Sequence, residues 1–369
     1  MQFLHLPLAL PELLFIPFIY LLRHRLDLRI KLTKPAIYLF CLLLLLLIIG
    51  FLLQNFRASS ILSTSRGYLY MLLSFAVFSG KNKTSMHDIM LICLGSVVGW
   101  CVLSIEQFNL ITRLAIDEDN SLSVSGNMVA LVLLVSIAII NKNNKVIILA
   151  IFLGLVLSLT TGLRRQIIVF FLAVVISYFF ILTSRKGNGL KIFLIIGTFG
   201  LSLVIIYPIV DNYINDISPI LHQRIFSKSE QFLTGDLSEA DKIRRDFINQ
   251  FLNNLDKYIL PQGFVSKRTM EDVGTGIYMD FPVLELAYTL GLIILVTFVF
   301  FYFKNILKHC KNYYRNHKTE SAVWATTAIV LFALLFLEGS NLNYSYITPF
   351  TGMVLGKISF GDMGKSVAT

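Results

Sequence analysis

The stretch AIYLFCLLLLLLIIGFLLQ, residues Ala36–Gln54, decides the class of fold. It contains no charged residue, and it is long enough to cross a bilayer, because a helix needs ~20 mostly apolar residues to span ~30 Å of hydrocarbon. The rest of the chain has the same character. Of its residues 56% are hydrophobic and only 15% are charged, and the mean hydropathy is +0.72. This composition excludes a soluble globular domain.

Further apolar stretches along the chain predict more spans. Seven are clear: His87–Ile105, Asn127–Asn141, Val146–Thr161, Ile167–Leu182, Leu190–Val210, Phe281–Phe303 and Ser321–Leu337. Three are weaker: Phe3–Leu22, which contains three prolines, Ile61–Ser79 and Tyr344–Ile358. We therefore expect an all-α polytopic integral membrane protein, with about 11 transmembrane helices in one membrane domain over residues 1–369.

The basic residues in the short loops predict the orientation of the chain. One set of alternate loops holds seventeen: Arg23, Arg25, Arg29, Lys31, Lys34, Lys81, Lys83, Lys142, Lys145, Arg185, Lys186, Lys191, Lys304, Lys308, Lys311, Arg315 and Lys318. The opposite short loops hold five: Arg57, Arg66, Arg113, Arg164 and Arg165. Cytoplasmic loops are enriched in Lys and Arg, so the first set is expected inside. The net charge of +10 is then a topology signal, and no nucleic-acid partner is expected.

The long loop 211–277 is expected on the outer face, and it is the one extended polar segment. It carries eight Lys/Arg and ten Asp/Glu. Within it, apolar residues recur at helical spacing from Ile243 to Ile259, and Pro261 and Gly263 end the pattern, which predicts an amphipathic helix. Arg244 and Arg245 fall in its first turn, near the apolar face. Either Arg244 extends its guanidinium back to water, or both arginines hold phosphate above the spans.

A second basic pair, Arg164-Arg165, lies in a very short turn on the same outer side. An arginine within a span costs about 2.5–3.5 kcal/mol on insertion scales unless it meets water or a partner. The pair could bind lipid headgroups at the interface. A planar guanidinium that grips phosphate oxygens in pairs better explains the choice of arginine.

The order of these motifs resembles the O-antigen polymerase and ligase superfamily. The span that ends Leu159–Arg165 (LTTGLRR) is similar to the family's T/S-x-S-R turn. Arg244–Phe247 (RRDF) followed by Leu260–Phe264 (LPQGF) resembles its arginine, amphipathic helix and P-x-G turn. Leu284–Ile293 (LELAYTLGLI) resembles the family's helix at the start of the span that follows the loop. The resemblance covers residues 125–303.

The resemblance implies a glycosyltransferase of the bacterial inner membrane, whose long loop is periplasmic. The substrate would be an undecaprenyl-pyrophosphate-linked oligosaccharide, with arginines binding its pyrophosphate. Arg245 matches the family arginine better than Arg244 by its distance from Pro261, and Arg164 or Arg165 matches the arginine of the turn. A polysaccharide chain-length regulator is an implied partner. Arg224, upstream of Gly235, fits an Arg-x10-Gly pattern seen in some polymerases. A pattern with only two fixed positions arises often by chance.

One departure separates polymerase from ligase within the superfamily. Ligases carry a His-Asn type motif before the span that follows the loop, whereas this chain has GIYMDF at residues 276–281. The absence of a histidine there favours an O-antigen polymerase. An O-antigen ligase, a flippase for lipid-linked oligosaccharides and a non-catalytic scaffold remain alternatives.

Asp280 and Glu285 are the candidates for a base that assists the attacking sugar hydroxyl. Each also has a structural interpretation: Asp280 as an interfacial helix cap, and Glu285 as a hydrogen-bonding group within the bundle. The sequence contains no CxxC, HExxH, Walker motif or dinucleotide glycine fingerprint, so neither a metal nor a cofactor is expected.

Overall fold

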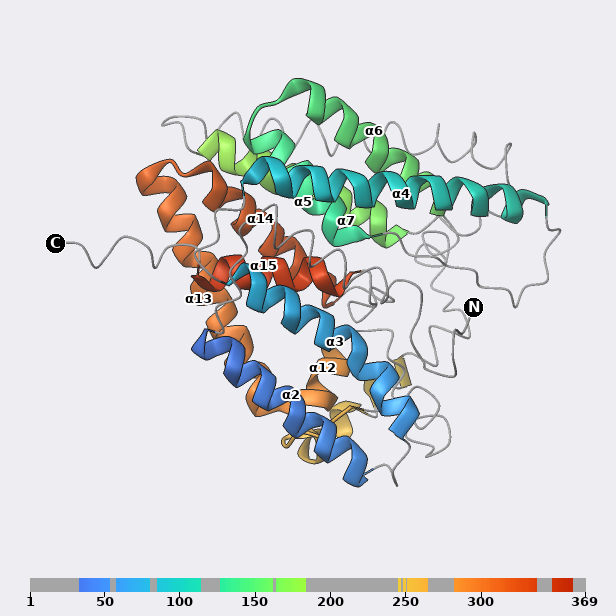
Figure 1. Ribbon diagram of the computed structural model, residues 1–369, viewed down its shortest axis with the longest axis vertical. Coiled ribbons are helices and arrows are strands. Elements are labelled where there is room, and N and C mark those ends of the chain that lie inside the picture. The colour runs from blue at the N-terminus through green and yellow to red at the C-terminus, as the bar shows by residue number, and fades with distance from the viewer. Residues whose placement is uncertain are drawn as a thin grey trace.

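A computed structural model describes residues 33–53, 58–79, 85–113, 127–161, 164–183, 245–246, 248–249, 251–264, 282–336 and 347–360. Within these ranges the secondary structure is helical, with no strand (Figure 1). The elements are α2 (Lys34–Leu53), α3 (Ala58–Phe78), α4 (Met86–Arg113), α5 (Met128–Ile140), α6 (Asn144–Thr161), α7 (Arg164–Thr183), the 3₁₀ helix η1 (Leu255–Tyr258), α12 (Pro282–Leu290), α13 (Leu292–Asn316), α14 (Thr319–Leu334) and α15 (Thr348–Phe360).

Four of the described helices are long and apolar enough to cross a membrane. They are α2, the part of α4 over Met86–Ser104, the part of α7 over Gln166–Thr183, and α13. Three further apolar helices are shorter: Met128–Ile140, Asn144–Leu157 and Thr319–Leu334. The expected spans Phe3–Leu22 and Leu190–Val210 lie outside the described residues. The all-helical class is therefore confirmed for the described residues, and four of their helices fit a bilayer by length and composition; the expected number of about 11 spans stays a prediction.

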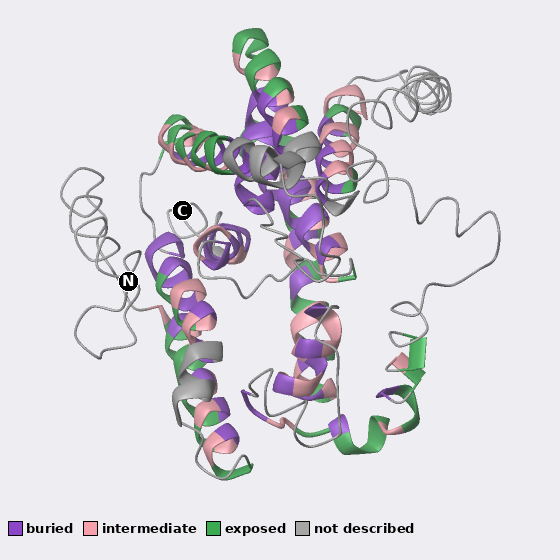
Figure 2. Ribbon diagram, turned by 90° about the vertical axis from the view of Figure 1, so that its right-hand side faces the viewer, coloured by how far each residue is buried: buried purple, intermediate pink, exposed green. Residues whose placement is uncertain are grey.

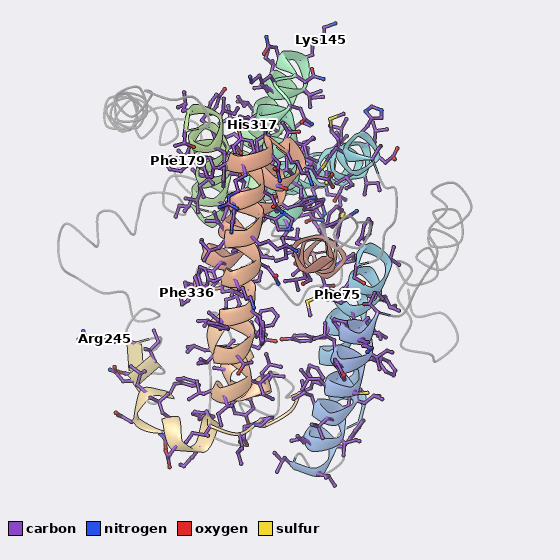
Figure 3. All side chains as sticks on the ribbon, turned by 90° about the vertical axis from the view of Figure 1, so that its left-hand side faces the viewer. Phe75, Lys145, Phe179, Arg245, His317 and Phe336 are labelled. Carbon is purple, nitrogen blue, oxygen red and sulfur yellow. The ribbon has the colours of Figure 1, made fainter. Side chains whose placement is uncertain are left out.

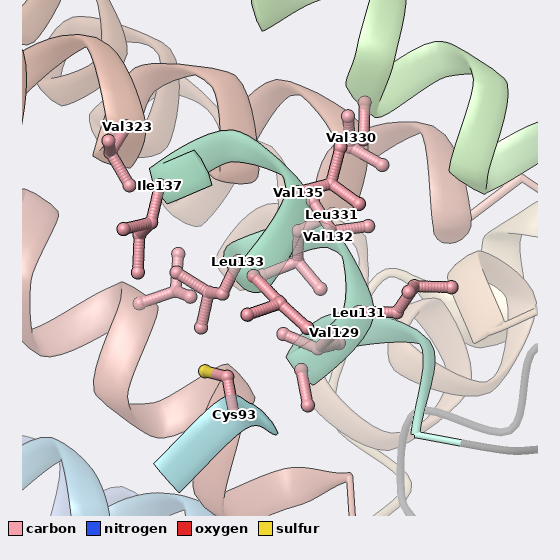
Figure 4. Packing of buried hydrophobic residues seen from close by; sticks show 14 of the residues in the cluster. Cys93, Val129, Leu131, Val132, Leu133, Val135, Ile137, Val323, Val330 and Leu331 are labelled. Carbon is pink, nitrogen blue, oxygen red and sulfur yellow. The ribbon is translucent and has the colours of Figure 1, made fainter. Parts of the chain in front are cut away.

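Helix α5 forms the centre of the larger bundle. Every one of its 13 residues is buried, which is one of the two environments, protein core or lipid, that suit a helix apolar on all sides. Helices α4, α6, α7 and α14 pack around it. Figure 4 shows Cys93 of α4 and Val323 and Val330 of α14 beside the α5 side chains.

The buried start of α5 is closed by Asn127. Its side-chain oxygen accepts a hydrogen bond from the Ala130 N–H at 3.0 Å, and its amide donates to Ser96 Oγ of α4 at 3.1 Å. One side chain thus caps α5 and joins it to a neighbour.

Apolar side chains also cover the outside of the molecule. On α2 and α13, Leu52, Val296 and Leu307 are among the large hydrophobic residues that are exposed. The exposed faces of the long helices are visible in Figure 2. Exposed apolar area on this scale is costly in water and favourable in hydrocarbon, which fits a bilayer environment.

A second group of helices lies beside the bundle. Helix α3 packs against α2 on one side and α15 on the other. Ser74 Oγ donates a hydrogen bond to the Pro349 carbonyl, and Gly352 and Gly356 of α15 meet the α3 backbone closely. Small residues allow such close approach between membrane helices.

The single span expected over Phe281–Phe303 is wrong in one respect. The helix breaks at Gly291, where φ is +76°, and divides into α12 and α13. Only glycine adopts this conformation without strain, so Gly291 permits the break. After it, α13 continues past the expected end to Asn316 and stops at His317, which has a left-handed conformation.

Candidate functional site

The described part of the long loop docks against the α12–α13 break. Residues 251–253 are helical and η1 follows, so the expected amphipathic helix passes into a tighter 3₁₀ turn near Asn254. Phe251 and Tyr258 are buried and stack with ring centroids 4.7 Å apart. Tyr258 also packs against Tyr288 of α12, at 5.5 Å between centroids.

The expected apolar face of this helix is only partly correct. Leu252, Leu255 and Ile259 are 53%, 38% and 44% exposed, although their spacing placed them on one face with Phe251. The change from 3.6 to 3.0 residues per turn rotates Leu255 and Ile259 out of that register, whereas Leu252 lies before the change. The helical conformation ends slightly before the expected stop: η1 ends at Tyr258, and residues 259–264, which include Pro261 and Gly263, are not helical.

Residues Pro261–Phe264, which we call the strap, join two helix pairs through their backbone. The N–H of Gln262 donates to the Tyr288 carbonyl at 3.1 Å, and the N–H of Gly263 donates to the Thr289 carbonyl at 3.3 Å. These are among the last carbonyls of α12, which the break at Gly291 deprives of helical partners. The N–H of Phe264 donates to the Leu46 carbonyl of α2 at 3.4 Å. The strap therefore satisfies backbone groups that are expensive to leave unpaired in a membrane.

Three glycines permit the strap to lie this close. A Cβ on Gly263, where φ is +75°, would lie 2.5 Å from the backbone nitrogen of Gly50, and a Cβ on Gly50 would lie 2.6 Å from the Phe264 carbonyl oxygen. A Cβ on Gly291 would lie 2.7 Å from the backbone of Pro261. No L-side chain fits at these separations without movement of the backbone.

Glu285 lies beside the strap, on the buried face of α12. Its side chain is only 4% exposed, and its Oε1 accepts a hydrogen bond of 3.0 Å from the hydroxyl of Tyr68 on α3. The Phe264 ring packs against the Tyr68 ring with centroids 5.0 Å apart. A carboxylate among apolar helices is expensive unless it is paired, and Tyr68 supplies a partner.

Of the arginines expected in the site, the structure describes the side chain of Arg245 alone. Arg164 is the first residue of α7, but the side chains of Arg164 and Arg165 lie outside the described residues, as do Arg224, Arg244 and Asp280. Arg245 is described; it is exposed at the end of the docked segment away from α3 (Figure 3). In Figure 1 the N-terminal end of α7 and the docked segment both lie away from the α13–α14 turn.

Two residues of α3 change the expectations from sequence. Arg66, counted above in a short loop, lies within α3, eight residues after Ala58 and so about 12 Å along the helix. By the same measure Lys304, Lys308 and Lys311 of the other set lie within α13, so the orientation stays a prediction. Tyr68, which no sequence pattern singles out, is the partner of Glu285.

The Glu285 carboxylate and the Tyr68 phenol therefore lie together in a site shielded from water. The docked segment that packs on α12 carries the exposed Arg245. The carboxylate and the phenol can orient a hydroxyl and accept its proton. No family model matches the chain, and neither the curated proteins nor the solved structures contain a significant match.

Proposed function

We propose that the chain is an O-antigen type polysaccharide polymerase. It would join undecaprenyl-pyrophosphate-linked repeat units on the periplasmic face of the inner membrane. The observation that carries the proposal is the packing of the strap on α12. It unites the three later parts of the resemblance, which are the helix that starts near Arg245, the turn at Pro261–Gly263 and the helix of Glu285.

The chemistry that this function requires matches the charged groups. The oxygen of an acceptor sugar hydroxyl bonds to the anomeric carbon of the donor, and the bond from that carbon to the phosphate oxygen breaks. Undecaprenyl pyrophosphate leaves with the electron pair, and the hydroxyl proton passes to a base. Negative charge grows on the leaving group, so arginines at 164–165 and 245 would stabilise the transition state more than the ground state.

Glu285 is the described candidate for the base. It lies on the helix that the strap contacts, and at 4% exposure its carboxylate is shielded from bulk water. Exclusion of water matters for this reaction, because water would compete with the sugar hydroxyl and release the glycan by hydrolysis.

A polysaccharide gel tests the proposal directly. We expect cells that lack this gene to lose the long ladder while they keep a lipid core that bears one repeat unit, and the wild-type gene to restore the ladder. Loss of the single capped unit as well would contradict polymerisation and indicate a ligase or flippase. A lipid-linked unit stranded outside indicates the former, and one trapped inside indicates the latter.

Three arginine and lysine variants then test the site. Arg245→Ala and Arg165→Ala should each abolish the ladder at normal protein levels, because each removes a guanidinium from the pyrophosphate. Lys228→Ala is the matched control: it removes a positive charge from the same loop and should leave the ladder intact. Equal behaviour of all three variants would refute the assignment of the arginines.

A further inference from the structure

We propose that Tyr68 is a positioning residue, which holds the Glu285 carboxylate in the orientation that removes the proton from the attacking sugar hydroxyl. This inference rests on the proposed function. It adds a residue from α3, far from the loop and from the arginines in sequence. The two side chains are separated by 217 positions and meet at 3.0 Å.

The first argument concerns the kind of partner that each buried hydroxyl has. Other ties between described helices use neutral groups: Tyr302 donates to the Ala328 carbonyl at 2.7 Å, Ser74 donates to that of Pro349, and Asn127 donates to Ser96 Oγ. Glu285 instead brings an ionisable group into an apolar site, where 4% of it is exposed. A carboxylate is an expensive choice for a mere tie between helices, so a chemical role is the better explanation.

The second argument concerns how the tyrosine itself is held. Phe264 of the strap packs on its ring, and Phe264 is buried with Leu43, Leu46 and Leu72 of α2 and α3. The strap is in turn bonded to α12 through Gln262 and Gly263. The phenol is therefore fixed from the same segment that carries Arg245, which links the position of the base to the position of the loop.

The third argument concerns how the hydrogen bond from Tyr68 acts on the Glu285 carboxylate. A carboxylate has two oxygens with about four lone-pair sites, and the phenol engages Oε1. This hydrogen bond to Oε1 holds the plane of the carboxylate relative to α3. Deprotonation of the sugar hydroxyl by Glu285 is then the only step in which Tyr68 takes part, and Tyr68 itself neither gains nor loses a proton.

The test uses purified full-length protein in liposomes, with the lipid-linked repeat unit extracted from the deletion strain as substrate. Tyr68→Phe keeps the ring against Phe264 and removes only the hydroxyl. We expect its kcat per folded protein to fall by about 10- to 100-fold, the effect of a hydrogen bond to a charged group, while KM stays unchanged. Glu285→Gln should lower kcat by about 100-fold or more. The double variant should be no slower than Glu285→Gln alone.

Tyr302→Phe is the control, because it removes a buried phenol hydroxyl that ties two helices through a neutral carbonyl. It should lower the thermal midpoint in detergent and leave kcat unchanged. If Tyr68→Phe changes stability in the same way and leaves kcat unchanged, Tyr68 is structural and the inference is overturned. A rise in KM alone would also overturn it, since Tyr68 would then bind substrate.

A further variant keeps the test decisive if Tyr68→Phe does not fold. Glu285→Asp retains a base but withdraws it from Tyr68 by one methylene, so kcat should fall with KM unchanged, and an unaltered kcat would count against the inference. Failure of the proposed function has a different signature. In that case the wild-type protein would produce no polymer from the repeat unit, whatever the variants do.

Discussion

Replacement of Gly263 by alanine should loosen the strap and destabilise the protein by about 2–5 kcal/mol. A non-glycine residue in the left-handed region costs about 1–2 kcal/mol, and φ here is +75°. The new Cβ would lie 2.5 Å from the Gly50 nitrogen and 2.6 Å from the Leu46 carbonyl oxygen. Both are backbone atoms of α2 and cannot rotate away, so overpacking adds about 1–3 kcal/mol.

Two other glycines separate these contributions. Gly50→Ala creates the same clash from the side of α2, against the Phe264 carbonyl, without left-handed strain. Because alanine also favours the helix by up to about 1 kcal/mol, the net destabilisation should be about 0–3 kcal/mol and smaller than that of Gly263→Ala. Gly99→Ala is the control, since a Cβ there meets nothing within 4 Å, and it should be neutral or stabilising by up to about 1 kcal/mol.

Denaturation of the purified protein in detergent micelles measures the order of the three variants, and a polysaccharide ladder from complemented cells reports their function. The expected order of stability is Gly99→Ala, then Gly50→Ala, then Gly263→Ala. If Gly263→Ala matches the wild type within about 0.5 kcal/mol, which is the range of neutral surface changes, the strap is not docked between α2 and α12.

Two further predictions concern other parts of the molecule. Asn127→Ala should destabilise the protein by about 1–3 kcal/mol, because it removes the cap of α5 and leaves buried polar groups unpaired. Asn143 caps the exposed start of α6, where its side chain accepts a hydrogen bond from the Val146 N–H at 3.3 Å, so Asn143→Ala should cost no more than about 1 kcal/mol. Equal losses of stability in denaturation experiments would refute the role of burial. The pKa of the Tyr258 hydroxyl is raised, first by burial and second by the Asp256 carboxylate. The folded state therefore keeps this proton to a higher pH than the unfolded state does. The stabilisation that results should be complete below about pH 10 and should decrease as the pH rises through the folded pKa. Tyr258→Phe should flatten that fall in a pH series of thermal midpoints, and an unchanged slope would show that Tyr258 does not titrate in the docked segment.

The sequence predicted the fold to the extent that length and hydropathy determine it. The expected span Asn127–Asn141 corresponds to α5 almost residue for residue, because apolar residues lie between two polar ends. What hydropathy could not predict is that α5 is surrounded by protein while α2, equally apolar, is exposed along much of its surface. Lipid tails and leucine side chains are equally apolar surroundings, so hydropathy alone does not tell a helix that packs in protein from a helix that faces lipid.

The site was less accessible to sequence analysis. Glu285 could be chosen because it is an acid near the expected outer end of a span, and Pro261 and Gly263 because they end helices. The break at Gly291 was missed, since a glycine in an apolar run is common and its φ depends on the strap that packs against it. Tyr68 was missed for a similar reason: its role arises from a contact across 217 positions, which no local pattern records.

The strap also bears on how this architecture can change through evolution. Its three ties to α2 and α12 are made by main-chain atoms, which every residue type except proline can supply. The ties therefore constrain only the few positions where a side chain must be absent, namely Gly50, Gly263 and Gly291. Lineages could replace nearly every other residue around the strap and keep its geometry, so kinship would persist in the spacing of three glycines long after overall similarity had decayed.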